Sequence, residues 1–256
     1  MNGEILKKYE ESWDFKIPPH MSVVIRVDGK NFSKLTSHLL KPFDNVFHSI
    51  MDTTAVDVAK EIDGCKLVYT QSDEATFILN NVDNQTLYFN GRIQKIVSIV
   101  AANMSIKFYK NFMQFILQYQ DKVQENIEMY SSNEIEAVNN RISSLWKFLD
   151  EDPIFDARVF VMPVEEEIEI LINRQNNSIN NSVLSAAQHY LGKKVCEGLK
   201  KNDMIIRLAN EGHNIDDILT DRDRLGAIAF KDDEEGWISQ VATRFSREEL
   251  ECNTKN

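Results

Sequence analysis

The feature that most constrains the fold is the order in which two hydrophobic patterns follow one another along the chain. Short runs rich in β-branched residues are typical of buried strands, whereas apolar residues spaced by three and four indicate amphipathic helices. The two patterns occur here in the order β-α-β-β-α-β. The predicted strands cover residues 22–27, 65–71, 75–79 and 155–162, and the predicted helices cover 44–62 and 92–112. This order predicts a ferredoxin-like α+β fold, in which two helices pack on one face of an antiparallel sheet.

Acidic residues stand at two places where predicted strands end. The first strand is followed directly by Asp28 and Gly29, and the hairpin between the second and third strands has Ser72 and Asp73 at its tip. In this sheet order both places can meet at one edge, which brings the carboxylates together. Mg²⁺ prefers oxygen ligands and is usually held by one or two carboxylates together with substrate phosphates. The pair therefore indicates a two-metal site, although each acid taken alone is equally typical of a plain turn.

Residues suited to holding phosphate groups follow Gly29 and recur in the predicted helices. Gly29 lets a ligand approach the backbone, and fixed positive charges further along the chain suit a triphosphate. These candidates are Lys30, Asn31, Phe32, Ser33, Lys41, Arg92 and Lys95. A lone lysine on a helix is more often a solvated surface charge. Arg174 lies in a polar interruption of the helical pattern 164–191, where it indicates either a phosphate contact or a helix-cap network.

The remaining segments are predicted to be mostly helical. A polar stretch at about 115–150 is rich in Glu and Asn and is interpreted as a helical insertion into a first domain of residues 1–163. Residues 164–256 are predicted to form a mostly helical C-terminal region. From Asp232 onward the sequence is charged and poorly periodic, which favours loose structure or an oligomer contact, with Trp237 and Phe245 as anchors.

Composition excludes several classes of protein. The chain has 29 basic and 40 acidic residues, a net charge of -11, so a polyanionic partner must be bound locally rather than by overall charge. The three cysteines form no CxxC pair, which argues against structural zinc and a disulfide framework and fits the reducing cytoplasm. The N-terminal residues lack the apolar core of a signal peptide, and the longest nearly apolar run, 96–106, is too short to span a membrane.

Six sequence blocks occur together in a known order. They are RVDGKNF (26–32), KPFD (41–44), YTQSDE (69–74), QKIVS (94–98), FDARVF (155–160) and RQNNSINNSVLSAAQ (174–188). In this combination the chain resembles the tRNA-His guanylyltransferase-like proteins, the 3′-to-5′ RNA polymerases. The last block is most similar to the relatives that repair the 5′ ends of truncated tRNA.

The resemblance implies a polymerase-palm catalytic domain, a helical second part and a homotetramer. Asp28 and Asp73 match the catalytic metal ligands, Gly29 adds a backbone carbonyl, and two Mg²⁺ ions are expected. The implied nucleotide-binding residues are Asp28, Gly29, Lys30, Asn31, Phe32, Ser33, Lys41, Asp44, Ser72, Asp73 and Lys95. Candidates for RNA or phosphate contacts are Arg26, Arg92, Arg174 and Asn181. The implied partners are tRNA, ATP, GTP and other nucleoside triphosphates, in the cytoplasm and without a membrane.

Three positions depart from the family pattern. The family often has tryptophan and aspartate where this chain has Asn173 and Asn177, and the guanylyltransferases have histidine where this chain has Ser178. The leading hypothesis is template-dependent addition of nucleotides to the 5′ end of tRNA after 5′ activation. The alternatives are addition of a single G to tRNA-His, a palm-domain nucleotide cyclase, and a catalytically silent RNA-binding or scaffold protein.

Overall fold

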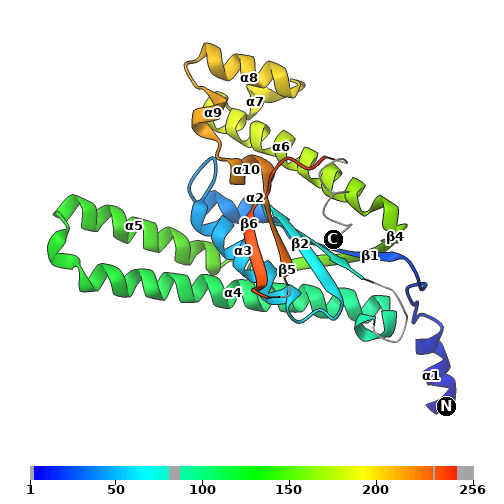
Figure 1. Ribbon diagram of the computed structural model, residues 1–256. Coiled ribbons are helices and arrows are strands. Elements are labelled where there is room, and N and C mark those ends of the chain that lie inside the picture. The colour runs from blue at the N-terminus through cyan, green and yellow to red at the C-terminus, as the bar shows by residue number, and fades with distance from the viewer. Residues whose placement is uncertain (1–2, 81–86, 233, 247–256) are drawn as a thin grey trace.

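A six-stranded antiparallel sheet forms the centre of the computed structural model, which describes residues 3–80, 87–232 and 234–246. The strand order is β4-β1-β3-β2-β5-β6. The strands are β1 (Ser22–Gly29), β2 (Cys65–Gln71), β3 (Glu74–Leu79), β4 (Phe155–Met162), β5 (Ala227–Asp232) and β6 (Gly236–Val241). The first four confirm the predicted strands, and the α+β fold class is confirmed with them (Figure 1).

Two helices, α3 (Asn45–Ala59) and α4 (Ile93–Glu125), cover one face of this sheet. Alternate residues of β1, Val23, Ile25 and Val27, point into the same core as the apolar stripes of both helices. Because side chains alternate along a strand, the neighbouring positions of β1 face the opposite side of the sheet. Shortly after β1 ends, a small helix, α2 (Phe32–Leu35), contributes Phe32 to a cluster of phenylalanine rings in this core.

The opposite face is covered in part by α6 (Glu167–Leu191), which is continuous. The interruption predicted over RQNNSINNS is therefore wrong. Its polar side chains are satisfied without breaking the helix: Gln175 donates to the carbonyl oxygen of Thr243 at 2.8 Å, accepts the N–H of Phe245 at 2.8 Å, and is fully buried. Beyond α6 follow α7 (Lys193–Cys196), α8 (Lys201–Asn210), α9 (Ile215–Ile218) and α10 (Asp221–Leu225).

Strands β5 and β6 were not predicted, and the expectation of loose structure after Asp232 is wrong for Gly236–Val241. β5 pairs with β2, and β6 pairs with β5, so the C-terminal region completes the sheet. The predicted anchor Phe245 is confirmed: it is buried, with its ring centroid 5.4 Å from that of Tyr69. Trp237 packs against the main core. Positions 233 and 247–256 of the predicted loose segment lie outside the described residues.

The polar stretch at about 115–150 is helical, as predicted. The end of α4 and α5 (Ser132–Leu149) lie side by side as a hairpin that extends beyond the sheet (Figure 1). A capping box between Ser131 and Glu134 starts α5, and Phe148 near its end is fully buried in the main core. The hairpin is thus anchored at its base.

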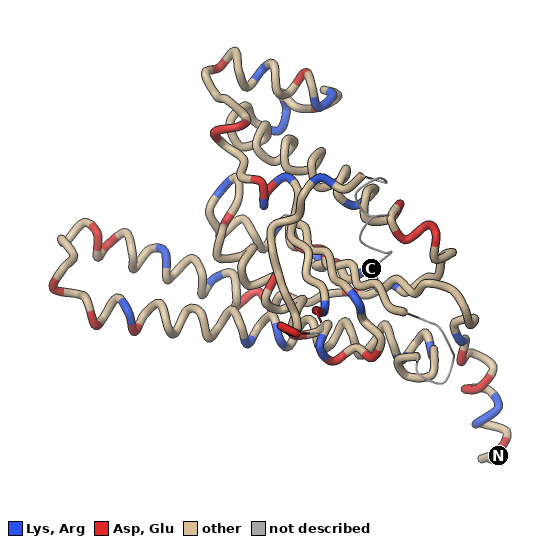
Figure 2. The backbone as a smooth tube through the Cα atoms, viewed as in Figure 1, with Lys and Arg blue, Asp and Glu red and all other residues tan. Residues whose placement is uncertain are grey.

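At the other side of the molecule α1 (Gly3–Glu11) buries none of its residues and projects from the body (Figure 1). Acidic and basic residues are interspersed along most of the helices, with a run of acids at the start of α6 (Figure 2). No helix among the described residues is long and apolar enough to cross a membrane.

Candidate active site

The end of β1 and the tip of the β2–β3 hairpin meet at one edge of the sheet, as the sequence predicted. The N–H of Gly29 donates to the carbonyl oxygen of Asp73 at 3.2 Å, and Asp28 pairs with Glu74 across β1 and β3. A Cβ placed on Gly29 would lie 2.8 Å from Oδ2 of Asp73 and 2.4 Å from the ring of Phe32. Glycine is therefore required here because the backbone lies against both side chains.

The two aspartates repel each other. Burial and then the charge of Asp28 raise the pKa of Asp73 to about 6. Burial and then the charges of Glu74 and Asp156 raise the pKa of Asp28. Carboxylates held together against repulsion favour a bound cation.

These residues suit a hard cation whose remaining ligands are oxygen atoms of the substrate. Among the described residues no cluster of three or more His, Cys, Asp or Glu side chains could hold a metal ion by itself. The two carboxylates and the nearby Gly29 carbonyl instead provide the few protein oxygens that Mg²⁺ usually takes when phosphates supply further ligands.

The hairpin tip itself is conformationally constrained. Ser72 has a φ of 46°, in the left-handed region that glycine favours. The residue after the acid, Glu74, is tied to α6 by a bidentate ion pair with Arg174, at 2.7 and 2.6 Å. Because both side chains are mostly buried, this pair fixes α6 against the strand that follows Asp73.

A cavity of about 470 Å³ opens beside the hairpin tip. It runs between the segment around α2 and the C-terminal half of α6. The predicted site residues that line it are Phe32, Ser33, Lys41, Asp44, Ser72 and Asp73. Asp28 and Gly29 lie next to it but do not line it. A volume of this size suits a nucleotide.

The far wall of this cavity was missed from the sequence. It is formed by Ser185, Gln188 and His189 of α6 and by Lys193 of α7. Lys193 and Lys41 line the same cavity, and the charge of Lys193 adds to burial in lowering the pKa of Lys41. The spacing of three and four from Ser185 to His189 is a signal for one polar helix face, but nothing in it indicates what that face covers.

Two of the predicted nucleotide residues also have structural roles. The carboxylate of Asp44 accepts the N–H groups of Leu40 and Val46 at 3.0 Å each and pairs with Arg141 at 2.7 Å, so its oxygens are occupied as a buried helix cap. The ring of Phe32 packs in the aromatic core, with its centroid 4.9 Å from that of Phe155. Neither side chain is available for a polar contact with a nucleotide.

Lys95 and Arg92 are not brought to this site within one chain. Ser105 of α4 accepts the N–H of Phe155, the residue that pairs with Gly29, so α4 reaches the site end of the sheet near Ser105. Lys95 lies ten positions earlier in this helix, about 15 Å away along its axis, with its Nζ 4.7 Å from the ring centroid of Phe89. Arg92 pairs with Asp14 at the same end. Lys95 therefore does not line this cavity of its own chain, and its triphosphate contact stays a prediction.

The other predicted residues do not line the cavity. Lys30 and Asn31 are exposed directly after β1, Arg26 is half-buried on β1, and Asn181 is exposed on α6. Arg174 does not take part in a helix-cap network, because its guanidinium binds Glu74 in the middle of a continuous helix. Its RNA or phosphate contact stays a prediction.

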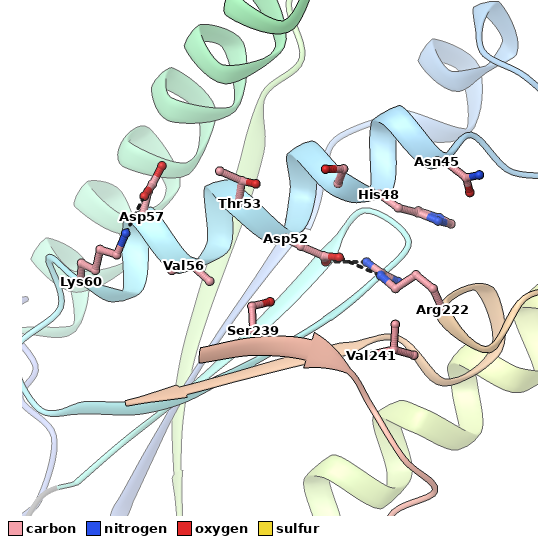
Figure 3. A pocket seen from close by; sticks show the side chains of 11 residues that line it. Asn45, His48, Asp52, Thr53, Val56, Asp57, Lys60, Arg222, Ser239 and Val241 are labelled. Carbon is pink, nitrogen blue, oxygen red and sulfur yellow. Dashed lines mark hydrogen bonds and ion pairs between the residues drawn. The ribbon is translucent and has the colours of Figure 1, made fainter. Parts of the chain in front are cut away.

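A second cavity, of about 500 Å³, lies between α3 and β6 and contains none of the predicted site residues (Figure 3). Its main polar feature is the bidentate pair of Arg222 with Asp52, at 2.9 and 2.6 Å. His48 lines both cavities, and burial followed by the charge of Arg222 lowers its pKa to about 3, which keeps the imidazole neutral. The charged groups of this cavity are paired with one another.

Comparison with known proteins agrees with this geometry. A family model described as tRNAHis guanylyltransferase (Thg1) matches residues 3–163. Uncharacterized protein R259 of Acanthamoeba polyphaga mimivirus is 29% identical over 83% of this chain and 70% of that protein. The probable tRNA(His) guanylyltransferase of Dictyostelium discoideum is 23% identical over 88% of this chain and 82% of that protein.

A solved structure matches nearly the whole chain. A bacterial tRNA(His) guanylyltransferase (Thg1)-like protein in complex with ATP superposes with a TM-score of 0.76 and 26% identity, covering 99% of this chain and 97% of that one. The match therefore includes β5, β6 and the helices that form the far wall of the cavity. Together with the acid pair at the end of β1, these findings show that the chain belongs to the tRNAHis guanylyltransferase (Thg1) family.

Proposed function

We propose that this protein adds nucleotides to the 5′ end of tRNA in the 3′-to-5′ direction, selects them by pairing with the opposite acceptor strand, and thereby repairs truncated 5′ ends. The observation that carries the proposal is the position of the acid pair beside a nucleotide-sized cavity: Asp73 lines the cavity, and Asp28 lies next to it. A similar bacterial protein has been solved with ATP and also with GTP. An enzyme that selects nucleotides by pairing with a template strand must be able to bind more than one kind of nucleotide.

In this proposal Asp28, Asp73 and the Gly29 carbonyl would hold Mg²⁺. Bound there, Mg²⁺ neutralises phosphate charge and favours ionisation of an attacking hydroxyl. Lys41 and Lys193 face the same cavity and would hold phosphates of the nucleotide. The hairpin, fastened to β1 by its backbone and to α6 by Glu74, keeps the acids in a fixed position. Catalysis of phosphoryl transfer depends mainly on such positioning and charge neutralisation.

The reaction begins with activation of a 5′-monophosphate RNA by a nucleoside triphosphate, or with a 5′-triphosphate end. The 3′-hydroxyl oxygen of the incoming nucleotide then forms a bond to the α-phosphorus at the 5′ end. The bond from that phosphorus to the leaving pyrophosphate or nucleotide breaks, and the hydroxyl proton is released. The chain therefore grows by one nucleotide at its 5′ end.

The repair type, rather than single-G addition, is proposed because Ser178 occupies the position of the guanylyltransferase histidine. In the structure Ser178 is buried and hydrogen bonds to Tyr69, so it stabilises the packing of α6 on β2 and does not line the cavity. A packing residue at this position leaves base selection to the template strand.

The test uses a tRNA that lacks its first 5′ nucleotide, with the opposing base varied through all four identities. Full-length tRNA-His with A opposite the new position is the parallel substrate. We expect the added nucleotide to follow the opposing base and addition to stop when the acceptor stem is complete. Addition of a single G to tRNA-His, with truncated tRNAs ignored, would instead support the guanylyltransferase function that the family model names.

A further inference from the structure

The outer face of α6 carries amide side chains where a solvent-exposed helix commonly carries charges. Between Glu169 and Glu197 the chain has no acidic residue, and Arg174 is the only lysine or arginine in that stretch before Lys193. Five asparagines, here called the amide row, lie on this face, four of them exposed and Asn177 half-buried. They are Asn173, Asn176, Asn177, Asn180 and Asn181.

The stability of α6 does not account for the amide row. Asparagine is a poor helix former, because its side chain competes for the backbone hydrogen bonds of the helix. Among the described residues no backbone group bonds to these five side chains. Asn177 donates to Asn173 at 3.4 Å, and Asn176 accepts from Arg244 at 2.6 Å. Each carboxamide has two donor hydrogens and an acceptor oxygen, so most of this hydrogen-bonding capacity is free for a ligand.

The amide row leads from the hairpin side of α6 to the wall of the nucleotide-sized cavity. Residues three or four positions apart are neighbours on a helix surface. Asn177 is three positions after Arg174, which binds Glu74 at the start of β3. Asn181 follows four positions later, and Ser185, four further on, lines the cavity. A ligand that lies along this face can therefore reach the candidate active site with one end.

The chemistry of this face indicates the ligand. The net charge of the chain is -11, so a polyanion must be bound where acids are lacking, as they are here. Arg244, which bonds to the row, is exposed and forms no ion pair with a described carboxylate. An uncharged amide does not neutralise phosphate, but it both donates to and accepts from a hydroxyl group. A-form RNA displays its 2′-hydroxyl groups in a wide, shallow minor groove.

Building on the proposed function, in which the 5′ end of a tRNA reaches the acid pair, we infer that the amide row binds the minor groove of the acceptor stem through 2′-hydroxyl groups. Residues 173–188 extend about 22 Å along α6, enough to follow several base pairs. Contacts to hydroxyl groups do not depend on base identity, so the row would accept tRNAs of different sequence. Asn173 and Asn177, two of the positions that depart from the family pattern, are thereby substrate-binding residues.

The test uses two acceptor-stem RNA hairpins of identical sequence, one with ribose and one with 2′-fluororibose throughout the stem. The fluoro sugar keeps the A-form helix but removes the hydroxyl donor. Fluorescence anisotropy gives the affinities for both RNAs, and calorimetry gives the affinity for ATP. The double variant Asn173→Ala/Asn177→Ala removes both members of a hydrogen-bonded pair. The control is Asn139→Ala, at an exposed asparagine within α5.

We expect the wild type and the control to bind the ribose stem more tightly than the fluoro stem. The double variant should bind the ribose stem about tenfold more weakly than wild type, as loss of two neutral hydrogen bonds does. Its affinities for the fluoro stem and for ATP should stay within about twofold of wild type. Its melting temperature without RNA should be equal or higher, because alanine is the better helix former. If it unfolds, Asn180→Ala, at a side chain that bonds to no described residue, gives the same comparison.

Equal affinity of the wild type for both stems, or an equal loss for both in the double variant, would overturn the inference. A loss of ATP affinity would assign the row to the free nucleotide, and a changed sedimentation coefficient without RNA would assign it to contact with a second copy. Either result would overturn it as well. Because binding needs no turnover, absence of nucleotide addition by the wild type would contradict the proposed function alone.

Discussion

The N–H of Gly29 and the carbonyl oxygen of Asp73 form a hydrogen bond of 3.2 Å that joins the end of β1 to the tip of the β2–β3 hairpin. The bond lies between the two backbones, so the hairpin turn that carries Asp73 is held directly against the end of β1 that carries Asp28. Burial, and then the charge of Asp28 held nearby, raises the pKa of Asp73, whereas burial and then the charges of Glu74 and Asp156 raise the pKa of Asp28.

Replacement of Asp73 by asparagine is expected to stabilise the metal-free protein at neutral pH. The pKa of Asp73 is about 6 in the folded chain against an ordinary value of 3.8, so its ionisation costs stability as the pH rises from 4 through 6. The difference corresponds to up to about 3 kcal/mol at pH 7. Urea unfolding in EDTA should show that Asp73→Asn is more stable than wild type at pH 7.5 and loses this advantage at pH 4. An equal difference at both pH values would contradict the assignment.

Gly29→Ala should destabilise the protein by about 1–3 kcal/mol, because the new methyl group would overlap the ring of Phe32 in a packed aromatic cluster. Gly3→Ala is the matched control, since nothing lies within 4 Å of a Cβ at that position. Thermal unfolding of both variants gives the comparison. If Gly29→Ala had the same melting temperature as the wild type, the close approach of β1 to Phe32 would be disproved. Phe32→Leu in the Gly29→Ala background should restore part of the loss.

Arg174→Met should cost about 3–5 kcal/mol of folding stability, because it leaves the mostly buried carboxylate of Glu74 without its partner. Lys7→Met, at the exposed pair with Glu11, is the control and should cost less than about 1 kcal/mol. Adding Glu74→Gln to Arg174→Met should recover much of the loss. A stable Arg174→Met variant with weakened phosphate binding would identify Arg174 as a ligand contact instead.

Lys41→Ala should weaken binding of ATP, whereas Lys95→Ala should leave it within about twofold of wild type. Lys41 lines the cavity, but Lys95 lies near the opposite end of the sheet. Isothermal calorimetry with the two variants makes the comparison directly. An equal loss in Lys95→Ala would mean that Lys95 reaches the cavity of a second copy of the chain.

The sequence predicted the parts of the fold that depend on local pattern. β-branched runs indicated β1 to β4, and the acids after β1 and at the hairpin tip came together because the strand order requires it. The continuity of α6 could not be predicted, because Gln175 is satisfied by backbone groups of Thr243 and Phe245, far along the chain. β5 and β6 are short and are stabilised by pairing with β2 and with each other, which no local pattern reveals.

The surroundings of single site residues could not be predicted where they are set by residues far away in the sequence. A family match identifies Asp44, but only the fold shows that Arg141 of the helical hairpin occupies its carboxylate. It identifies Lys95, but only the length and direction of α4 show that this residue lies away from the cavity of its own chain. Conversely, Lys193 carries no motif and enters the site only because α6 ends beside α3.

The most direct test of the central claim is nucleotide addition to a 5′-triphosphate tRNA that lacks its first nucleotide, with Mg²⁺ and labelled nucleoside triphosphates. Wild type, Asp28→Asn and Asp73→Asn are compared after circular dichroism has shown that all three are folded. The control is Asp57→Asn, which changes a half-buried carboxylate of α3 that does not line the site cavity. The account predicts addition by wild type and control and loss of at least about a hundredfold in both site variants. Near wild-type addition by either folded site variant would contradict the assignment of the acid pair as the catalytic centre.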